Sequence, residues 1–251
     1  MSNAAPLLSA RGLTRRFGGL LAVNRVSLDL RVGSLHAVIG TNGAGKSTLV
    51  NVLSGELPVS EGEVLLDGRD ITRLPQHRRA HAGVGRSYQR TTIFPQFSTL
   101  ENCRLAAQAA AQKPWNLFQP AHACSHSVPL AHEVLEVAGL SSLAARQAGS
   151  LSHGQKRQLE IAMCLATRPR VLLLDEPLAG MGAEESERML SLLERLKLDH
   201  AVLLVEHDMD AVFRVADLIT VMVNGEVIAS DAPQAIRDNP EVQLAYLGDA
   251  H

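Results

Sequence analysis

The sequence predicts an α/β domain that has a largely parallel sheet and is interrupted by a helical block at residues 89–165. Two observations predict this fold class. Short apolar segments of strand length alternate with segments of helical periodicity, which is typical of parallel strands connected by helices. In the middle of the chain, alanine-rich segments of helical periodicity replace the strand-like ones. With 251 residues, the chain is long enough for one large domain or two small ones.

Strands and one helix follow each other in the N-terminal part. The segment Val26–Leu30 alternates apolar and polar residues, as expected of a strand with one buried face. A short apolar strand at Leu35–Ile39 runs into a glycine-rich stretch, after which a helix is expected over Lys46–Leu53. Further strands are expected at Leu7–Leu13 and Glu63–Leu66, and the latter ends at an Asp-Gly turn.

The central block begins near Gln89 and contains three segments of helical periodicity. Helices are expected over Glu101–Ala111, Ala131–Ala138 and Gln155–Ala166. The stretch at 112–129 contains three prolines, so an irregular connection is expected between the first two helices.

Strand-like segments return in the C-terminal part. Short apolar runs at Val171–Leu174, Ala201–Val205 and Leu218–Val223 have strand length. Asn-Gly after the third run predicts a hairpin into Glu226–Ala229. Between the first two runs, Glu184–Leu198 is predicted to be an amphipathic helix, because its apolar residues recur on one face.

The charge balance excludes some classes of partner. The 24 basic and 26 acidic side chains give a formal charge of −2, which provides no bulk attraction to nucleic acid, so no nucleic-acid partner is expected. No apolar run has the length of a membrane-spanning helix, so any membrane-spanning part must come from other chains. The first residues lack the pattern of a signal peptide, and a cytoplasmic location is therefore expected.

The strongest chemical motif follows the predicted strand at Leu35–Ile39. The sequence Gly-Thr-Asn-Gly-Ala-Gly-Lys-Ser fits G-x-x-x-x-G-K-[ST] in full, between a strand and a helix. Glycines allow backbone N–H groups to turn inward, and the helix N-terminus adds positive potential suited to phosphate. The predicted phosphate-binding residues are Gly40, Thr41, Asn42, Gly43, Ala44, Gly45, Lys46, Ser47 and Thr48.

Roles within this motif follow from chemistry. Lys46 is expected to reach the β- and γ-phosphates, and the hydroxyl of Ser47 is a hard oxygen ligand suited to Mg²⁺.

Two carboxylates, Asp175 and Glu176, end a later apolar strand. Adjacent side chains at a strand end point in different directions, so they can serve different roles. Asp175 is placed as the Mg²⁺-side carboxylate, and Glu176 could orient or deprotonate an attacking water.

A phosphate loop alone leaves kinases, GTPases and transport ATPases open, and four further segments narrow the choice. Leu151–Arg157 (Leu-Ser-His-Gly-Gln-Lys-Arg) resembles the LSGGQ signature of the ATP-binding-cassette (ABC) ATPases. In the same order as in that family, Gln89 resembles the Q-loop glutamine and His207 the switch histidine. Phe17 resembles the aromatic residue that stacks on adenine, and Val23 is taken as a further nucleotide-binding residue.

The resemblance implies a fold and a domain organisation. It implies the P-loop ABC ATPase fold, with a RecA-like core sheet, an antiparallel β-subdomain and an inserted helical subdomain. The chain would then be a single ATPase domain over 1–251, with the helical subdomain at 89–165 and a C-terminal tail at 240–251.

The subfamily can be narrowed by three segments. Phe17–Asn24, Glu206–Met209 and the tail look like the branched-chain amino acid (LIV-type) importer ATPases. Urea and amide importers share this pattern, and lipopolysaccharide-export ATPases are similar. The resemblance thus implies an ATPase that energises an amino-acid importer. The alternatives are a urea or amide importer, a lipid exporter, and, from other classes, a non-transport ABC protein or a P-loop kinase.

The family resemblance also implies partners and catalytic roles. Two ATPase chains pair head to tail, as a homodimer or a homologous heterodimer, and bind permease subunits at the cytoplasmic face of the inner membrane. A periplasmic solute-binding protein acts indirectly. ATP is hydrolysed with Mg²⁺ bound by Ser47, Gln89 and Asp175, and catalysis involves Lys46 together with Glu176, His207 and Gln89. Across the dimer, the γ-phosphate is covered by the signature residues Ser152, His153, Gly154 and Gln155.

Three positions depart from the common family pattern. Thr41 replaces a frequent proline of the phosphate loop, and His153 stands where many members have glycine. Gly182 replaces the usual acidic or amide residue of the D-loop, which puts one contact across the dimer in doubt.

Overall fold

The computed structural model describes residues 5–87, 92–111 and 126–247. In these ranges, the strands form two sheets. The larger has six strands in the order β10-β9-β3-β8-β7-β6, and the smaller has four in the order β2-β1-β4-β5. The strands are β1 (Leu8–Phe17), β2 (Leu20–Leu30), β3 (Ser34–Gly40), β4 (Glu61–Leu66), β5 (Arg69–Asp70), β6 (Val84–Arg86), β7 (Val171–Asp175), β8 (Ala201–Val205), β9 (Leu218–Val223) and β10 (Glu226–Asp231).

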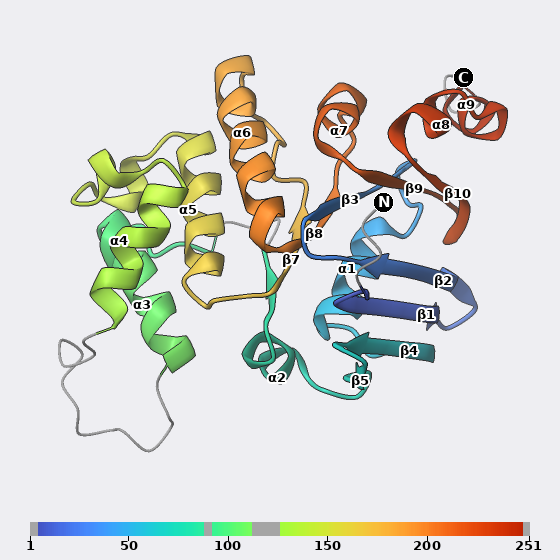
Figure 1. Cartoon of the computed structure of the whole chain (residues 1–251), viewed down its shortest axis with the longest axis horizontal. Helices are drawn as coiled ribbons and strands as arrows, with labels where there is room; N and C mark the ends of the chain where they lie inside the picture. The colour runs from blue at the N-terminus through green and yellow to red at the C-terminus, as the bar shows by residue number, and fades with distance from the viewer. Residues whose placement is uncertain (1–4, 88–91, 112–125, 248–251) are drawn as a thin grey trace.

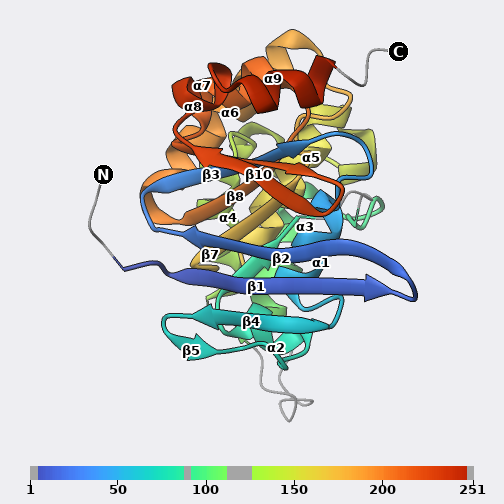
Figure 2. The ribbon, with the colours of Figure 1, turned by 90° about the vertical axis from the view of Figure 1, so that its right-hand side faces the viewer.

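Helices cover the larger sheet on both faces. The helices are α1 (Lys46–Ser54), α2 (Gln76–His81), α3 (Thr99–Ala111), α4 (Ser127–Val137), α5 (His153–Leu165), α6 (Ala183–Asp199), α7 (Met209–Val215), α8 (Pro233–Arg237) and α9 (Pro240–Leu247). Figure 1 shows α3, α4 and α5 gathered on one side of the molecule and the antiparallel strands β1, β2 and β4 on the other. Turned by 90°, Figure 2 shows the strands β2, β1, β4 and β5 one below the other, with β10 and β3 above them.

The core consists of two apolar clusters, one on each face of the larger sheet. Strand residues alternate between them: Val38 and Leu203 pack with α1 and the antiparallel sheet, whereas Ile39 and Leu204 pack on the side of the helices α3 to α7. This alternation follows from the two-residue period of a strand. Strands β9, β3, β8, β7 and β6 pair in parallel, and of the strands described here only β10 pairs antiparallel in this sheet. The predicted fold class, α/β with a largely parallel sheet, is therefore confirmed.

Several elements differ from the prediction. β1 and β2 extend to Phe17 and from Leu20, so that they form one long hairpin across a glycine turn. The mixed polarity of this stretch concealed the strands, because an antiparallel sheet keeps one face in solvent. Helix α4 begins at Ser127 rather than at 131, and Pro129 fits because the first turn of a helix needs no backbone N–H bond. The short elements β5, β6, α2, α7, α8 and α9 were not predicted.

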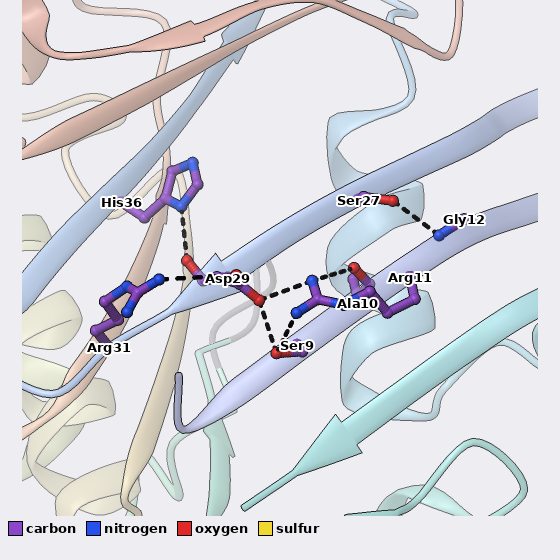
Figure 3. A network of polar contacts seen from close by, with 8 residues as sticks. All are labelled: Ser9, Ala10, Arg11, Gly12, Ser27, Asp29, Arg31 and His36. Atoms are coloured by element: carbon purple, nitrogen blue, oxygen red, sulfur yellow. Dashed lines mark hydrogen bonds and ion pairs between the residues drawn. The ribbon is translucent and has the colours of Figure 1, made fainter. Parts of the chain in front are cut away.

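A buried histidine connects the two sheets. The Nδ1 of His36 lies 3.1 Å from the carbonyl oxygen of Asp29 on β2, and its Nε2 lies 2.7 Å from the hydroxyl of Thr220 on β9. Figure 3 shows the first contact and the carboxylate of Asp29, which accepts a hydrogen bond from Ser9 (2.7 Å) and pairs with Arg11 (2.8 Å). The imidazole is 3 % exposed, and burial lowers the pKa of His36 below its ordinary value.

The burial of His36 makes the free energy of unfolding depend on pH. In the folded chain burial disfavours the protonated imidazole of His36, whereas the unfolded chain takes up a proton as pH falls through the ordinary histidine pKa of about 6.5. The free energy of unfolding should therefore fall from pH 7 to pH 5, by at most about 1.4 kcal/mol per pH unit from this group. Urea unfolding at several pH values should show a smaller dependence for His36→Gln than for the parent. The exposed His81 is a matched control, and His81→Gln should keep the parental dependence. Equal slopes for parent and His36→Gln would contradict the assignment.

Candidate functional site

The segment that joins β3 to α1 forms a tight loop whose glycines are sterically required. Gly40, Gly43 and Gly45 have φ values of 152°, 79° and 96°, which other residues rarely adopt. A Cβ at Gly45 would lie 2.0 Å from the carbonyl oxygen of Ala22, and a Cβ at Gly40 would lie 2.0 Å from that of Met222. The loop therefore approaches the backbone of two other strands so closely that only glycine fits.

Backbone hydrogen bonds fix the loop between the two sheets. Gly225, in the turn between β9 and β10, donates its N–H to the carbonyl oxygen of Ala44 (3.0 Å), and its own carbonyl accepts from Asn24 on β2 (2.8 Å). The N-terminus of α1 has no side-chain cap, so the donors of its first turn are available to an anion.

The side chain of Lys46 folds back into this loop. Its ammonium donates to the carbonyl oxygens of Gly40 (2.7 Å) and Thr41 (2.8 Å), and the residue is 8 % exposed. Burial lowers the pKa of Lys46, and the nearby carboxylates of Glu176 and Asp175 oppose this shift. A cation is thus held beside the curve of the loop, where phosphate oxygens are expected.

The loop opens into a cavity of about 430 Å³, within the size range of small-molecule sites. Phe17, at the end of β1, lines its mouth and is 42 % exposed. The guanidinium of Arg15 lies 4.5 Å from the centroid of the Phe17 ring. Among the other predicted residues, the cavity is lined by Asn42, Gly43, Ala44, Gly45, Lys46, Ser47, Thr48 and Glu176. A larger cavity, of about 730 Å³, lies elsewhere, between α4, α5 and α6.

Val23 does not belong to this cavity. It is fully buried in the apolar cluster between the two sheets, so the structure gives it a packing position rather than a place on the cavity wall. Gln89 lies outside the described residues.

Asp175 ends β7 beneath the phosphate loop. Its Oδ1 lies 3.5 Å from the hydroxyl oxygen of Ser47. Its Oδ2 is buried and has no hydrogen-bond partner in the described part of the chain. Burial raises the pKa of this carboxyl, and Arg86 opposes the shift. A buried carboxylate oxygen without a partner, next to a hydroxyl, is a donor set that fits a hard divalent cation such as Mg²⁺.

Glu176 stands directly after β7 in a left-handed conformation. Its φ is 50°, which is uncommon for a residue with a side chain and typical of positions that function constrains. Its N–H donates to the carbonyl oxygen of Val205 at the end of β8 (2.9 Å), which fixes the turn. The side chain then lines the same cavity as Lys46.

Glu206 is a functional candidate that the sequence analysis did not single out. It follows β8, and its side chain is fully buried. Its Oε1 accepts the N–H of Leu178 (2.7 Å), and its Oε2 accepts the N–H of His207 (3.2 Å). Burial raises the pKa of Glu206, whereas these two hydrogen bonds lower it. The carboxylate thus ties the loop after Glu176 to the histidine loop, and the only signal in the sequence was an acid directly before that histidine.

His207 itself is exposed, with 62 % of its side chain accessible, and its Nδ1 lies 3.7 Å from Oε2 of Glu206.

The predicted signature residues lie at the start of α5. Ser152 caps this helix and forms a reciprocal capping box with Gln155. Ser152 and His153 are exposed, and none of the four signature residues is among those that line the phosphate-loop cavity.

Comparisons with known proteins agree with this geometry. A family model described as "ABC transporter" matches residues 23–179, and one described as "Branched-chain amino acid ATP-binding cassette transporter" matches residues 226–251. The chain is similar to the high-affinity branched-chain amino acid transport ATP-binding protein BraF of Pseudomonas aeruginosa, with 42 % identity over 98 % of this chain and 99 % of that protein. The corresponding protein LivG of Escherichia coli is 40 % identical over 98 % of this chain and 99 % of its own length.

Solved structures that superpose on this chain are also ATP-binding cassettes of ABC transporters. A nucleotide-free ATP-binding cassette from an ABC transporter superposes with a TM-score of 0.85 at 30 % identity, covering 96 % of this chain and 99 % of that one. An ATP-binding cassette in its ADP conformation superposes with a TM-score of 0.85 at 29 % identity, covering 98 % and 100 % of the two chains. Across the ranges that the structure describes, no helix is long and apolar enough to cross a membrane.

The loop geometry predicts a sharp effect of Gly45→Ala. The added Cβ would collide with the carbonyl of Ala22, and a positive φ alone costs about 1–3 kcal/mol with a side chain. The variant should lose nucleotide binding, as measured by titration with a fluorescent ATP analogue. Gly182→Ala is the matched control, since a Cβ there meets nothing within 4 Å and φ is −76°. Parental affinity in Gly45→Ala would show that the loop does not hold the phosphates.

Proposed function

The chain belongs to the ABC transporter family, and from this premise we propose that it hydrolyses ATP to drive the import of branched-chain or other amino acids. The observation that carries the ATPase role is the convergence of a glycine loop, Lys46 and Glu176 on one cavity, with the carboxylate of Asp175 3.5 Å from the hydroxyl of Ser47 in the same loop. The match of the C-terminal residues and the names of the similar proteins support the transported class.

Nucleotide binding follows from the groups that line the cavity. The phosphates occupy the curve of the loop, where backbone N–H groups and the N-terminus of α1 supply donors. The ammonium of Lys46 then exchanges two carbonyl oxygens for the β- and γ-phosphates. The exposed ring of Phe17 offers a face on which adenine stacks, and the guanidinium of Arg15 lies against the same ring.

Hydrolysis places a water in line with the γ-phosphate. The water oxygen forms a bond to phosphorus while the bond to the β-phosphate oxygen breaks, so that ADP leaves. Glu176 orients the water and accepts its proton, because its carboxylate lines the cavity beside Lys46. His207 contacts the γ-phosphate, and Gln89 is assigned to the water and the metal by the family pattern.

Ser47 and Asp175 are the residues that would hold Mg²⁺, with Gln89 as a third ligand. The ion, when bound, neutralises charge on the β- and γ-phosphates. The protein contributes a buried carboxylate whose orientation is fixed by the strand end, where Ser87 accepts the backbone N–H of Asp175 (3.3 Å).

A second ATPase chain is required to complete the site. In the signature turn, Ser152 and His153 are exposed, and none of the four residues Ser152, His153, Gly154 and Gln155 lines the phosphate-loop cavity of its own chain. We assign the turn to the γ-phosphate bound by a partner, in a homodimer or a homologous heterodimer. A hydroxyl and the backbone N–H groups at a helix start are donors suited to phosphate.

Permease subunits are the proposed membrane partners. Phe94 and Phe97 are 50 % and 44 % exposed, with ring centroids 5.7 Å apart, and this pair offers an apolar docking surface. Behind them, Ala148 donates its N–H to the carbonyl oxygen of Phe97 (2.9 Å), and Gly149 donates to that of Pro95 (2.9 Å). This backbone pairing connects the docking surface with the signature turn a few residues further on. Bound to permease subunits, the chain would lie at the cytoplasmic face of the inner membrane.

Co-purification tests the transport function. A tag on the chain should recover multi-spanning membrane subunits, and the ATPase activity of that complex should rise when a periplasmic binding protein loaded with a branched-chain amino acid is added. Stimulation by a urea- or amide-loaded binding protein instead would favour the alternative importer. Recovery of the chain without membrane subunits would contradict a role in transport.

Substitution of Glu176 should separate binding from hydrolysis. Glu176→Gln removes the proton acceptor but keeps the shape, so the variant should bind Mg-ATP, dimerise and hydrolyse at least about 10²-fold more slowly. Lys46→Ala should instead lose ATP binding, because the loop loses its cation. Phosphate release and nucleotide titration measure the two effects. Turnover of Glu176→Gln at the parental rate would remove this carboxylate from its role.

A further inference from the structure

The signature turn already holds an anion from its own chain. The hydroxyl of Ser152 donates to Oε1 of Glu185 on α6 over 2.7 Å, and the backbone N–H of Gly154 also hydrogen bonds this carboxylate. The N–H of Gly182 is a third donor to the same group. These bonds lower the pKa of Glu185, that of Ser152 contributing most, so the carboxylate is charged at neutral pH.

The absence of a side chain at Gly154 creates the space for this carboxylate. A Cβ built at Gly154 would lie 2.6 Å from the carboxylate carbon of Glu185 and 2.8 and 2.9 Å from its oxygens. The conformation of Gly154 is that of an ordinary helix and does not require glycine. The glycine is therefore explained by the anion that sits over the helix start, and not by backbone strain.

A phosphate needs the same donors. Gly154 is the second residue of α5, so its N–H has no partner within the helix, and the Ser152 hydroxyl has one proton to donate. Neither donor can form a full hydrogen bond to a carboxylate oxygen and to a phosphate oxygen at the same time. Two anions at one helix N-terminus also repel each other at close range.

We propose that the carboxylate of Glu185 occupies the hydrogen-bond donors of the signature turn that bind phosphate. The γ-phosphate bound to the partner subunit must displace this carboxylate before the dimer closes. This inference rests on the proposed function, in which the signature turn contacts a partner's ATP. ADP has no γ-phosphate that could accept hydrogen bonds from these donors, so Glu185 stays bound to the signature turn when the partner subunit holds ADP. The carboxylate thereby makes closure selective for the triphosphate. Once displaced, it lies near Arg188 on the next turn of α6, a cation that already attracts it.

The matched pair Glu185→Gln and Glu184→Gln tests this proposal. Both remove one negative charge from the first turn of α6, but Glu184 pairs with Arg188 and not with the signature turn. The transporter complex, purified through a tag on this chain so that its natural ATPase partner is present, is assayed for hydrolysis over a range of ATP concentrations. Glu185→Gln should lower the ATP concentration for half-maximal hydrolysis about tenfold, the order of one charge-assisted hydrogen bond. Glu184→Gln should leave it unchanged.

A misfolded variant would not give this result, because loss of structure does not lower the ATP concentration for half-maximal hydrolysis. A half-maximal concentration that is unchanged or higher in Glu185→Gln would overturn the proposal. Ser152→Ala distinguishes this failure from a failure of the proposed function: if Ser152→Ala hydrolyses ATP as the parent does, the signature turn does not contact the nucleotide at all.

A measurement on the isolated chain tests the contact itself. The amide of Gly154 should be protected from hydrogen exchange in the parent and in Glu184→Gln, and should exchange faster in Glu185→Ala. Equal exchange in all three would show that the carboxylate does not occupy the turn.

Discussion

Backbone N–H groups can surround a triphosphate only where no Cβ stands in the way, and the site of this protein depends on that constraint. The loop after β3 is wedged between β2 and the end of β9, where the carbonyls of Ala22 and Met222 leave no room for side chains at Gly45 and Gly40. The glycines that expose the phosphate donors are therefore the same residues that let the two sheets pack on the loop. Nucleotide binding and the assembly of the sheets share one set of contacts.

Parallel strands bring the chemistry to this loop. β7 and β8 are neighbours and run in the same direction, so their carboxyl ends meet at one edge of the sheet. Two buried carboxylates at this edge differ in how they are satisfied. Glu206 accepts hydrogen bonds on both oxygens and holds two loops together, whereas one oxygen of Asp175 has no partner in the residues described. Since an unsatisfied buried carboxylate oxygen is costly, the first suits a positioning role and the second suits a ligand.

The two halves of the proposed ATP site are on different surfaces of one chain. The cavity is lined by the loop, Lys46 and Glu176, whereas the signature turn lies apart and binds Glu185. An anion-binding turn that is filled by a carboxylate of its own chain can exchange that carboxylate for another anion. The same turn follows closely on the segment paired with Phe97 and Pro95, which couples this exchange to the proposed docking surface.

The sequence by itself determined the fold class and the motifs whose residues are contiguous: the phosphate loop, the acidic pair at the end of β7 and the signature turn. Local patterns suffice there, because hydrogen bonding of strands, glycine conformation and helix capping act over a few residues. Only the tertiary structure decided that Val23 is a core residue, that Pro129 lies inside a helix and that Glu206 bridges two loops. The contact of Ser152 with Glu185, 33 positions away, belongs to the same class. Such contacts depend on how α5 and α6 pack together, and packing through space leaves no periodic trace along the chain.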